Sequence, residues 1–462
     1  MASRLVMAVA FASLLVTPFP VAAQEDGPVY IVEEGDTLIG IATRFGTTVE
    51  DLAAANGLAD PSAIFPGMRL VLPGFEGISG VLETRPVDLG ENLVSLGLKH
   101  HTPPESLARL NRIANPSRLY VGQPFIVPVE QGEDQPLNVT LVQPPPGTSA
   151  LEMAVQVGAN PWILDGLNGA SSRLWLSADE PLFVPGGDEL PRALPASIGS
   201  VSIEPEQPGQ GHTAILSADL FEDGTLAGNL GNRQLNFEPE PEDSLKRVAL
   251  QGIHALAEPG LVDLTLTYTP SGEGAPFTFM QPVRIREEDY PREALTVPTE
   301  TLDPANTVPE DQQVAALLAP VTPEKMWDGP FLFPADYHET FPSQFGSRRN
   351  YNGTGWNSYH TGLDLYGSTD TEIHAPAPGV VVFAGPLTVR GNTTYIDHGW
   401  GVYSGYFHQS EIFVQPGDPV EPGDLIGMVG GTGRVTGAHL HWEIWVGGVP
   451  VQPLDWTETS LP

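Results

Sequence analysis

Gly437-Ala438-His439-Leu440-His441-Trp442-Glu443 is the stretch that says most about the fold and the chemistry of this chain. The run predicts a β-strand, on which successive side chains point to opposite faces, so His439 and His441 share one face. A second cluster, His360-Thr361-Gly362-Leu363-Asp364, lies upstream. Together the two clusters offer three imidazole or carboxylate ligands and a spare imidazole. A hydrolytic zinc site needs that set, with one position left open for water.

The composition limits the class of protein. With 462 residues the chain is long enough for several domains, each with its own core. The net charge of −36 argues against nucleic acid or anionic lipid as the main partner, and a solvated acidic surface is the simplest explanation of that charge. The 47 prolines and 50 glycines favour β domains, turns and linkers. Because there is no cysteine, histidine and carboxylate must hold any metal.

Residues 1–23 are expected to be a secretory signal peptide. Arg4 supplies positive charge, Leu5 to Val16 is apolar, and Val21-Ala22-Ala23 supplies small residues for cleavage. The alternative is an uncleaved anchor, but the apolar run is shorter than the roughly 18 residues that a membrane span needs. We therefore expect an exported protein without an integral membrane segment after cleavage.

An internal repeat governs the first part of the mature chain. In three segments the same two spacings join a glycine, an asparagine and a proline: Gly35–Asn56–Pro73, Gly90–Asn111–Pro128 and Gly147–Asn168–Pro185. Such self-similarity marks repeated structural units. Each unit is expected to run strand-helix-helix-strand, and in the first unit Asp36 is expected to cap the first helix.

The repeat resembles the LysM module, a βααβ unit that binds N-acetylglucosamine-containing glycans such as peptidoglycan and chitin. Residues 28–74 match it through Glu34-Gly35-Asp36-Thr37-Leu38, and residues 84–129 keep Tyr120-Val121-Gly122-Gln123. Residues 137–186 form a degenerate third copy, which has Pro144-Pro145-Pro146 and lacks Pro-Gly before its last strand. Whether this copy binds glycan, or serves only as a spacer, stays open.

Two further segments follow the repeats. Residues 196–287 contain short alternating runs between turn signals, which predicts an all-β sandwich that resembles an immunoglobulin-like domain. Residues 288–328 are rich in Pro, Glu and Thr, with a possible short helix near Glu310 to Leu318. They are expected to form a linker, or a strap over the neighbouring domain.

Residues 329–462 carry several motifs in a characteristic order: Phe345-Gly346-Ser347-Arg348-Arg349, His360-Thr361-Gly362-Leu363-Asp364, Tyr406-Phe407-His408 and Gly430 to His441. These motifs and their order resemble those of peptidase family M23. Its members are the lysostaphin- and LytM-like zinc metallopeptidases that cut peptidoglycan peptides. It departs from the family in small ways, such as Ala438 where proline is usual. The resemblance implies a mainly antiparallel β domain with a groove over the zinc.

The resemblance also implies roles for single residues. His360, Asp364 and His441 would hold one Zn²⁺ ion, and His408 and His439 would be catalytic. From spacing alone either His439 or His441 could be the third ligand, and Gly362 would allow the bend that brings His360 to Asp364. Which of His408 and His439 is the general base stays open.

Other polar and aromatic residues near the motifs are expected to be structural. Glu443 is expected on the strand face opposite His441 and not to be a ligand. His398 is expected to support the sheet or to rim the groove, and Trp442, Trp445 and Trp456 are expected to fill the core. Arg348 and Arg349 could meet a substrate carboxylate or pair with the many acids of the chain.

The expected fold class is multidomain, α+β and all-β. The expected function is a secreted zinc-dependent endopeptidase of the bacterial cell envelope that cleaves peptide stems or cross-bridges of peptidoglycan. Peptidoglycan would then be the partner twice, as peptide at the active site and as N-acetylglucosamine glycan at the LysM modules. The alternative is a non-catalytic, wall-binding activator of a cell-wall amidase. Both D-alanyl-diaminopimelate and glycine bridges stay open as the scissile bond.

Overall fold

The computed structural model describes residues 27–129, 139–145, 147–168, 181–186, 193–195, 197–272, 276–335, 340–435 and 437–462. The expected signal peptide, residues 1–23, lies outside the described residues. The chain divides into two compact units, Met1–Glu83 with Ile126–Asp134, and Thr84–Phe125 with Gln135–Pro462. In the described ranges no helix is both long and apolar enough to cross a bilayer.

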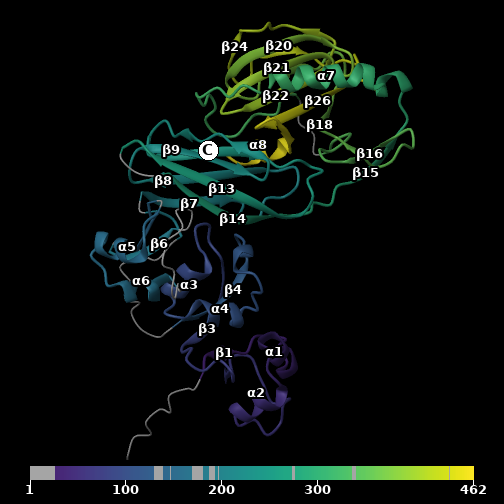
Figure 1. Ribbon diagram of the computed structural model, residues 1–462. Helices are drawn as coiled ribbons and strands as arrows, with labels where there is room; N and C mark the ends of the chain where they lie inside the picture. The colour runs from purple at the N-terminus through teal and green to yellow at the C-terminus, as the bar shows by residue number, and fades with distance from the viewer. Residues whose placement is uncertain are drawn as a thin grey trace, which may run out of the picture. The chain divides into compact units, whose positions relative to one another are not determined.

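The first repeat folds as a βααβ unit, as the sequence predicted (Figure 1). Its two short strands pair in antiparallel fashion, and the buried faces of its helices supply Leu38, Ile41, Phe45 and Leu52. The elements are β1 (Val29–Ile31), α1 (Leu38–Phe45), α2 (Val49–Ala55) and β2 (Arg69–Val71). The second repeat supplies β3 (Val81–Pro86), α3 (Leu93–Lys99), α4 (Pro104–Leu110), η1 (Pro116–Arg118) and β4 (Pro124–Val129); the third supplies β5 (Val139–Val142), α5 (Ala150–Gln156), α6 (Pro161–Asn168) and β6 (Leu182–Pro185).

All three repeats start their first helix in the same way. The N-cap residue stands two positions after the repeated glycine, and its side chain accepts a backbone N–H of the first turn; these residues are Thr37, Asn92 and Ser149. The prediction that Asp36 caps the first helix was therefore wrong. Its carboxylate instead accepts the hydroxyl of Tyr30 at 2.7 Å and the backbone N–H of Glu33 at 2.8 Å, which closes the turn before the helix.

The repeated asparagine has a structural role that explains its fixed spacing. The Asn56 amide donates to the carbonyls of Leu52 and Val71 and accepts the N–H of Val71, so it joins the second helix to the last strand. In the third repeat Asn168 makes the same three bonds, to Leu164 and to both backbone groups of Phe183. The degenerate copy has therefore kept the architecture of the unit.

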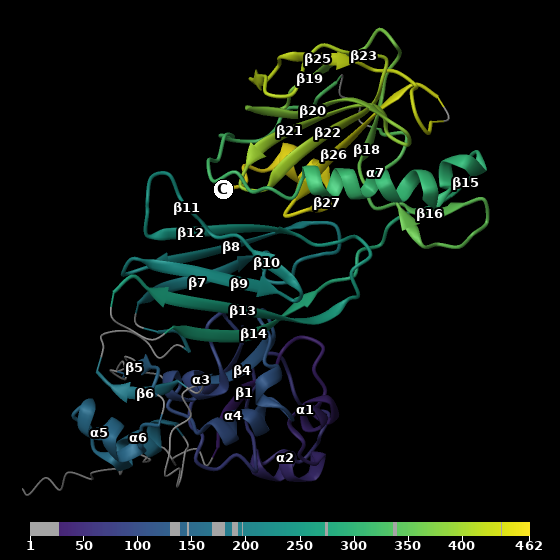
Figure 2. The ribbon, with the colours of Figure 1, turned by 45° about the horizontal axis from the view of Figure 1, so that its top comes forward.

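Residues 198–285 form two antiparallel four-stranded sheets that share one core (Figure 2). Alternation of buried and exposed side chains, seen along β9, turns one face of each sheet towards that core. This confirms the predicted β character, while the immunoglobulin-like assignment stays a prediction. The sheet orders are β10-β9-β13-β14 and β11-β12-β8-β7, with β7 (Ile198–Glu204), β8 (Thr213–Leu220), β9 (Gly224–Leu230), β10 (Arg233–Leu235), β11 (Glu238–Pro239), β12 (Lys246–Gly252), β13 (Gly260–Pro270) and β14 (Phe277–Ile285).

The C-terminal region is built on a seven-stranded antiparallel sheet, as predicted. Trp442 and Trp456 are fully buried in its core, whereas Trp445 is only partly buried. The order is β18-β26-β22-β21-β20-β24, with β27 paired to β26; the bounds are β18 (Leu363–Tyr366), β20 (Gly379–Leu387), β21 (Gly391–Gly399), β22 (Val402–Gln409), β24 (Pro419–Val420), β26 (His439–Val446) and β27 (Val449–Val451). A smaller sheet holds β19 (Glu372–His374), β25 (Leu425–Met428) and β23 (Glu411–Ile412), and α8 (Pro453–Glu458) ends the fold.

Residues 288–318 are a strap that packs on this domain, rather than a free linker. β15 (Arg292–Leu295) pairs in parallel with β16 (Arg348–Tyr351), which pairs with β17 (Ser358–Tyr359). After η2 (Thr299–Leu302) comes α7 (Pro304–Leu317), which is longer than the predicted short helix and lies against the large sheet in both views (Figures 1 and 2). Val314 and Leu318 are buried there against Tyr395, Tyr403 and Phe407.

Polar and apolar contacts join the sandwich to the seven-stranded sheet. Val248 and Leu250 of β12 belong to the same core as that sheet, and the N–H of Gln452 donates to the carbonyl of Gly211 at 2.7 Å. Next to them His212 Nδ1 lies 2.7 Å from Asp455 Oδ2. This hydrogen bond, against the opposing effect of burial, raises the pKa of His212.

The His212–Asp455 pair predicts a pH-dependent stability. A raised folded-state pKa means that the stabilisation is complete below about pH 6.5, the ordinary value for histidine, and is lost as pH rises through the folded-state value. We expect His212→Gln to lower the thermal midpoint clearly at pH 6 and less at pH 9. Thermal unfolding followed by circular dichroism measures the difference, with His101→Gln at an exposed site as the control. A difference that stays constant from pH 6 to pH 9 would contradict the assignment.

Candidate metal centre

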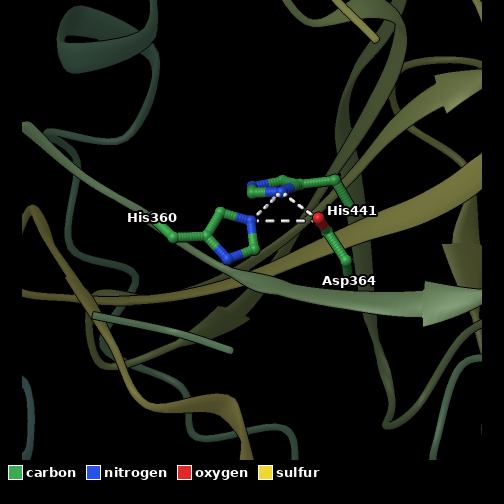
Figure 3. Close-up of side chains that lie close together, drawn as sticks. All are labelled: His360, Asp364 and His441. Carbon is green, nitrogen blue, oxygen red and sulfur yellow. Dashed lines mark hydrogen bonds and ion pairs between the residues drawn. The ribbon is translucent and has the colours of Figure 1, made fainter. Parts of the chain in front are cut away.

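Three buried side chains converge on one point (Figure 3). His360 Nε2 lies 3.0 Å from Asp364 Oδ1 and 2.8 Å from His441 Nδ1, and His441 Nδ1 lies 2.9 Å from the same carboxylate oxygen. The exposed fraction of each residue is 7% or less. Two nitrogens and one oxygen therefore face a common centre that is largely shielded from water.

Strand pairing explains how the two sequence clusters meet. β18 and β26 are antiparallel neighbours, and their register sets Asp364 directly opposite His441. His360 lies before β18, and the expected bend at Gly362 brings its Nε2 to 3.0 Å from Asp364 Oδ1. This turn needs glycine at position 362. A Cβ there would come within 2.4 Å of the Trp442 carbonyl oxygen and 2.7 Å of His441 Nε2.

Hydrogen bonds on the far side of each imidazole determine which nitrogen faces the centre. His360 Nδ1 lies 2.9 Å from the carbonyl of Gln344, and a carbonyl can only accept, so Nδ1 carries the hydrogen and Nε2 keeps the lone pair. His441 Nε2 lies 3.1 Å from Glu443 Oε1, which leaves the Nδ1 lone pair for the centre. Phe407 stacks on the His441 ring at 4.9 Å and fixes its plane.

Glu443 is the residue that the sequence reading placed wrongly. Since the strand period is two, position 443 lies on the same face as position 441, and the fully buried carboxylate accepts from both His441 and Trp445. It is not one of the three convergent groups but holds one of them in place. The spacing of two residues from His441 was the signal that could have identified it.

Charge favours the ligating form of two of the three groups. Burial alone would raise the pKa of Asp364, but His360 and His441 hold it well below the usual value. Burial lowers the pKa of His360 and keeps its ring neutral. Burial also opposes the charged form of His441, yet hydrogen bonds to Asp364 and Glu443 raise its pKa, so a cation would compete with a proton for this ring.

The two remaining histidines lie beside the centre. His439 Nε2 is 3.6 Å from Asp364 Oδ1, and its Nδ1 is bonded to the carbonyl of Gly437 at 2.9 Å. The ring of His408 lies 5.1 Å from that of His439, and its Nδ1 is bonded to the carbonyl of Thr432 at 2.8 Å. Burial and the neighbouring His441 and His439 lower the pKa of His408 to about 3. The structure thus brings all five predicted site residues together.

Other candidate residues take structural positions. His398 is buried between the carbonyl of Pro378 and the hydroxyl of Ser404, as expected of a residue that supports the sheet. Arg348 donates to the carbonyl of Ala255 in the sandwich. Arg349 binds Glu293 of the strap at 3.3 Å and lies 3.9 Å from Asp364, so it is the arginine of the pair that faces the site.

Comparisons with known proteins agree with this geometry. Residues 358–453 match the family model of peptidase family M23, and residues 30–73 and 87–128 match that of the LysM domain. The chain is 37% identical over 122 residues to the peptidoglycan DD-endopeptidase ShyA of Vibrio cholerae, which covers 26% of this chain and 28% of that protein. It is 43% identical over 95 residues to the DD-carboxypeptidase/endopeptidase Mpg of Neisseria meningitidis, which covers 21% of this chain and 22% of that protein.

A solved structure also aligns with the chain. The catalytic domain of lysostaphin from Staphylococcus simulans aligns with 23% identity and a TM-score of 0.21, over 29% of this chain and 92% of that domain. The chain spans only about a quarter of the length of the two curated relatives.

The close approach at Gly362 predicts that Gly362→Ala weakens metal binding. The added methyl group would displace His441 or the β26 backbone, and we expect the affinity for Zn²⁺ to fall by at least about tenfold, as for lost outer-shell contacts. Competition with a chromogenic chelator measures the affinity. Gly385→Ala, where the nearest atom lies at 3.6 Å, is the control. An unchanged affinity in Gly362→Ala would show that the approach does not position His441.

The Glu443 contact predicts a second effect on metal affinity. Glu443→Gln keeps the shape but weakens the orientation of His441, so the affinity for Zn²⁺ should fall by about 10–100-fold. Isothermal titration with Zn²⁺ measures it, and the thermal midpoint shows whether the variant is folded. The exposed Glu258→Gln should bind as the unsubstituted protein does. If Glu443→Gln is folded and binds equally tightly, the carboxylate only fills the core.

Proposed function

Since residues 358–453 form a domain of peptidase family M23 that LysM domains precede, we propose that the protein is a secreted zinc-dependent endopeptidase that cleaves peptide stems or cross-bridges of peptidoglycan. The observation that carries the proposal is the convergence of His360 Nε2, Asp364 Oδ1 and His441 Nδ1 on one point. His408 and His439 beside that point supply the proton-transfer groups.

The donor set fits Zn²⁺. Zinc is held by imidazole nitrogen and carboxylate oxygen at about 2 Å, so two of its ligand atoms lie at most about 4 Å apart. The three separations here, 2.8, 2.9 and 3.0 Å, satisfy this limit. When bound, such an ion supplies Lewis acidity, which polarises a scissile carbonyl and acidifies water.

The histidines beside the centre are placed to move protons. Because Nδ1 of both His408 and His439 donates to a backbone carbonyl, both rings present the Nε2 lone pair. His439 Nε2, 3.6 Å from Asp364 Oδ1, is positioned to accept the proton of an attacking water and to return it to the leaving amine. His408 is held with φ +62° at the end of β22, and we assign it the stabilisation of the oxyanion or a share in the proton relay.

The LysM domains would add affinity for the wall without altering the active site. A module that binds N-acetylglucosamine glycan keeps the peptidase near its substrate and raises the effective concentration of stem peptides. The signal peptide expected at residues 1–23 would bring the protein to the cell envelope. The alternative, a non-catalytic activator of an amidase, needs neither the three convergent groups nor the two histidines beside them.

The proposed roles predict different outcomes for two neighbouring histidines. His441→Ala removes a ligand, so the protein should lose both its zinc and its release of soluble muropeptides from purified peptidoglycan, each by more than about 100-fold. His439→Ala should keep near-equal zinc and still lose turnover by about 10²–10⁴-fold, because only the proton-transfer group is missing. Metal analysis and mass spectrometry of the digestion products measure the two effects.

The matched control for this pair is His374→Ala. His374 is partly exposed and lies 3.3 Å from Glu372, away from the centre, so its zinc content and turnover should not change. Equal muropeptide release by the unsubstituted protein and His441→Ala would overturn the endopeptidase proposal. A protein with neither zinc nor turnover in its unsubstituted form would support the amidase activator instead.

A further inference from the structure

The strap places a carboxylate in a preformed anion site. Glu310 of α7 is 5% exposed, and one of its oxygens accepts the backbone N–H of Val389 at 2.7 Å. The other accepts the backbone N–H of Arg390 at 3.2 Å and its guanidinium at 2.8 Å. Two consecutive amides and a guanidinium are a strong carboxylate-binding arrangement.

This anion site belongs to the groove of the metal centre. Val389 and Arg390 lie between β20 and β21, and the carbonyl of Arg390 accepts the N–H of His408 at 3.0 Å. The guanidinium lies 5.5 Å from the ring of Phe407, the ring that stacks on His441. A cavity of about 350 Å³ is lined by Arg390, His408 and His441 on one side and by strap residues on the other, among them Thr307 and Asp311.

Three arginines line this cavity, and the strap supplies a partner to each. Arg349 binds Glu293, Arg390 binds Glu310, and Arg434 donates to the carbonyl of Thr301 at 3.1 Å. Nε of Arg390 is buried and has no hydrogen-bond partner among the described residues, so this guanidinium keeps one donor unused. Cationic groups around a peptidase groove suit a substrate that carries carboxylates.

We propose that the two amides of Val389 and Arg390 with the Arg390 guanidinium form a subsite for a carboxylate of the peptide stem, and that Glu310 occupies it as a built-in substrate mimic. The inference rests on the proposed function, whose substrate is a peptide with free carboxylates. When substrate binds, its carboxylate replaces that of Glu310 on the same donors. The hydrogen bonds of the subsite are of the same kind in both states, so they do not by themselves favour the closed strap over bound substrate.

The packing of α7 permits this exchange. In its 14 residues only Glu310 and Val314 are buried, so few apolar contacts hold the helix to the sheet. Pro309 inside the helix removes one backbone hydrogen bond next to Glu310. Helix α7 is therefore the removable part of the strap, held mainly by polar contacts that a substrate would replace, whereas β15 is anchored by its pairing with β16.

The first test measures the mobility of the strap and does not depend on catalysis. Because the chain has no cysteine, a spin label at Gln312→Cys, an exposed position of α7, reports only on the strap. Adding Glu310→Gln should raise the mobile fraction of the label by about tenfold, since a charged hydrogen-bond partner is lost. Adding Glu258→Gln, an exposed change in the sandwich, should leave the spectrum unchanged. An immobile label in Glu310→Gln would overturn the proposal.

The second test measures the preference of the subsite for a carboxylate. In zinc-loaded His439→Ala protein that also carries Glu310→Gln, a synthetic stem peptide with a free C-terminal carboxylate should bind about tenfold more tightly than its C-terminal amide. Adding Arg390→Lys should remove most of that preference, with the thermal midpoint showing that the variant is folded. Equal affinity of the two peptides would overturn the subsite. This readout is binding, so a failure of the endopeptidase proposal would appear separately, as loss of turnover in the unsubstituted protein.

Discussion

The site depends on the register between β18 and β26. That pairing sets Asp364 opposite His441, and it is possible only because Gly362 lets the preceding turn approach the β26 backbone. A slip of one residue would turn Asp364 and His441 to opposite faces. The buried apolar residues of the same strands, Leu363, Leu440 and Trp442, hold the register, so the core of the domain also determines the geometry of the metal centre.

Backbone carbonyls and one buried carboxylate do the remaining positioning. The carbonyls of Gln344, Thr432 and Gly437 each accept from one imidazole and so choose the nitrogen that faces the groove. Glu443 does the same for His441. Since these acceptors belong to the rigid sheet and its turns, the lone pairs are oriented before any ion or substrate arrives.

Much of this could be predicted from the sequence, and the reasons for the misses are physical. The ligand types and the βααβ repeats follow from local residue patterns and spacing, whereas the antiparallel domain and the choice of His441 as a ligand followed from the resemblance to peptidase family M23. Glu443 was predicted on the wrong face of the strand. Because side chains alternate with a period of two, positions 441 and 443 lie on the same face. The capping role of Thr37 rather than Asp36 depends on a turn that Tyr30 closes from outside the local motif. The partners of Arg390 could not be predicted, because Glu310 and Arg390 are far apart in the chain.

The chain is strongly acidic, yet its groove contains arginines that the strap contacts. A protein with 57 acidic and 21 basic side chains would repel an acidic peptide over most of its surface. Three of those basic side chains, Arg349, Arg390 and Arg434, line the groove beside the acidic Asp311 and Glu443, and they form a region that can bind carboxylates. Left open, such a region would attract the acidic residues of the chain itself. The contacts with Glu293 and Glu310 fill it from within, so access to the groove becomes a competition between internal and substrate carboxylates for the same donors.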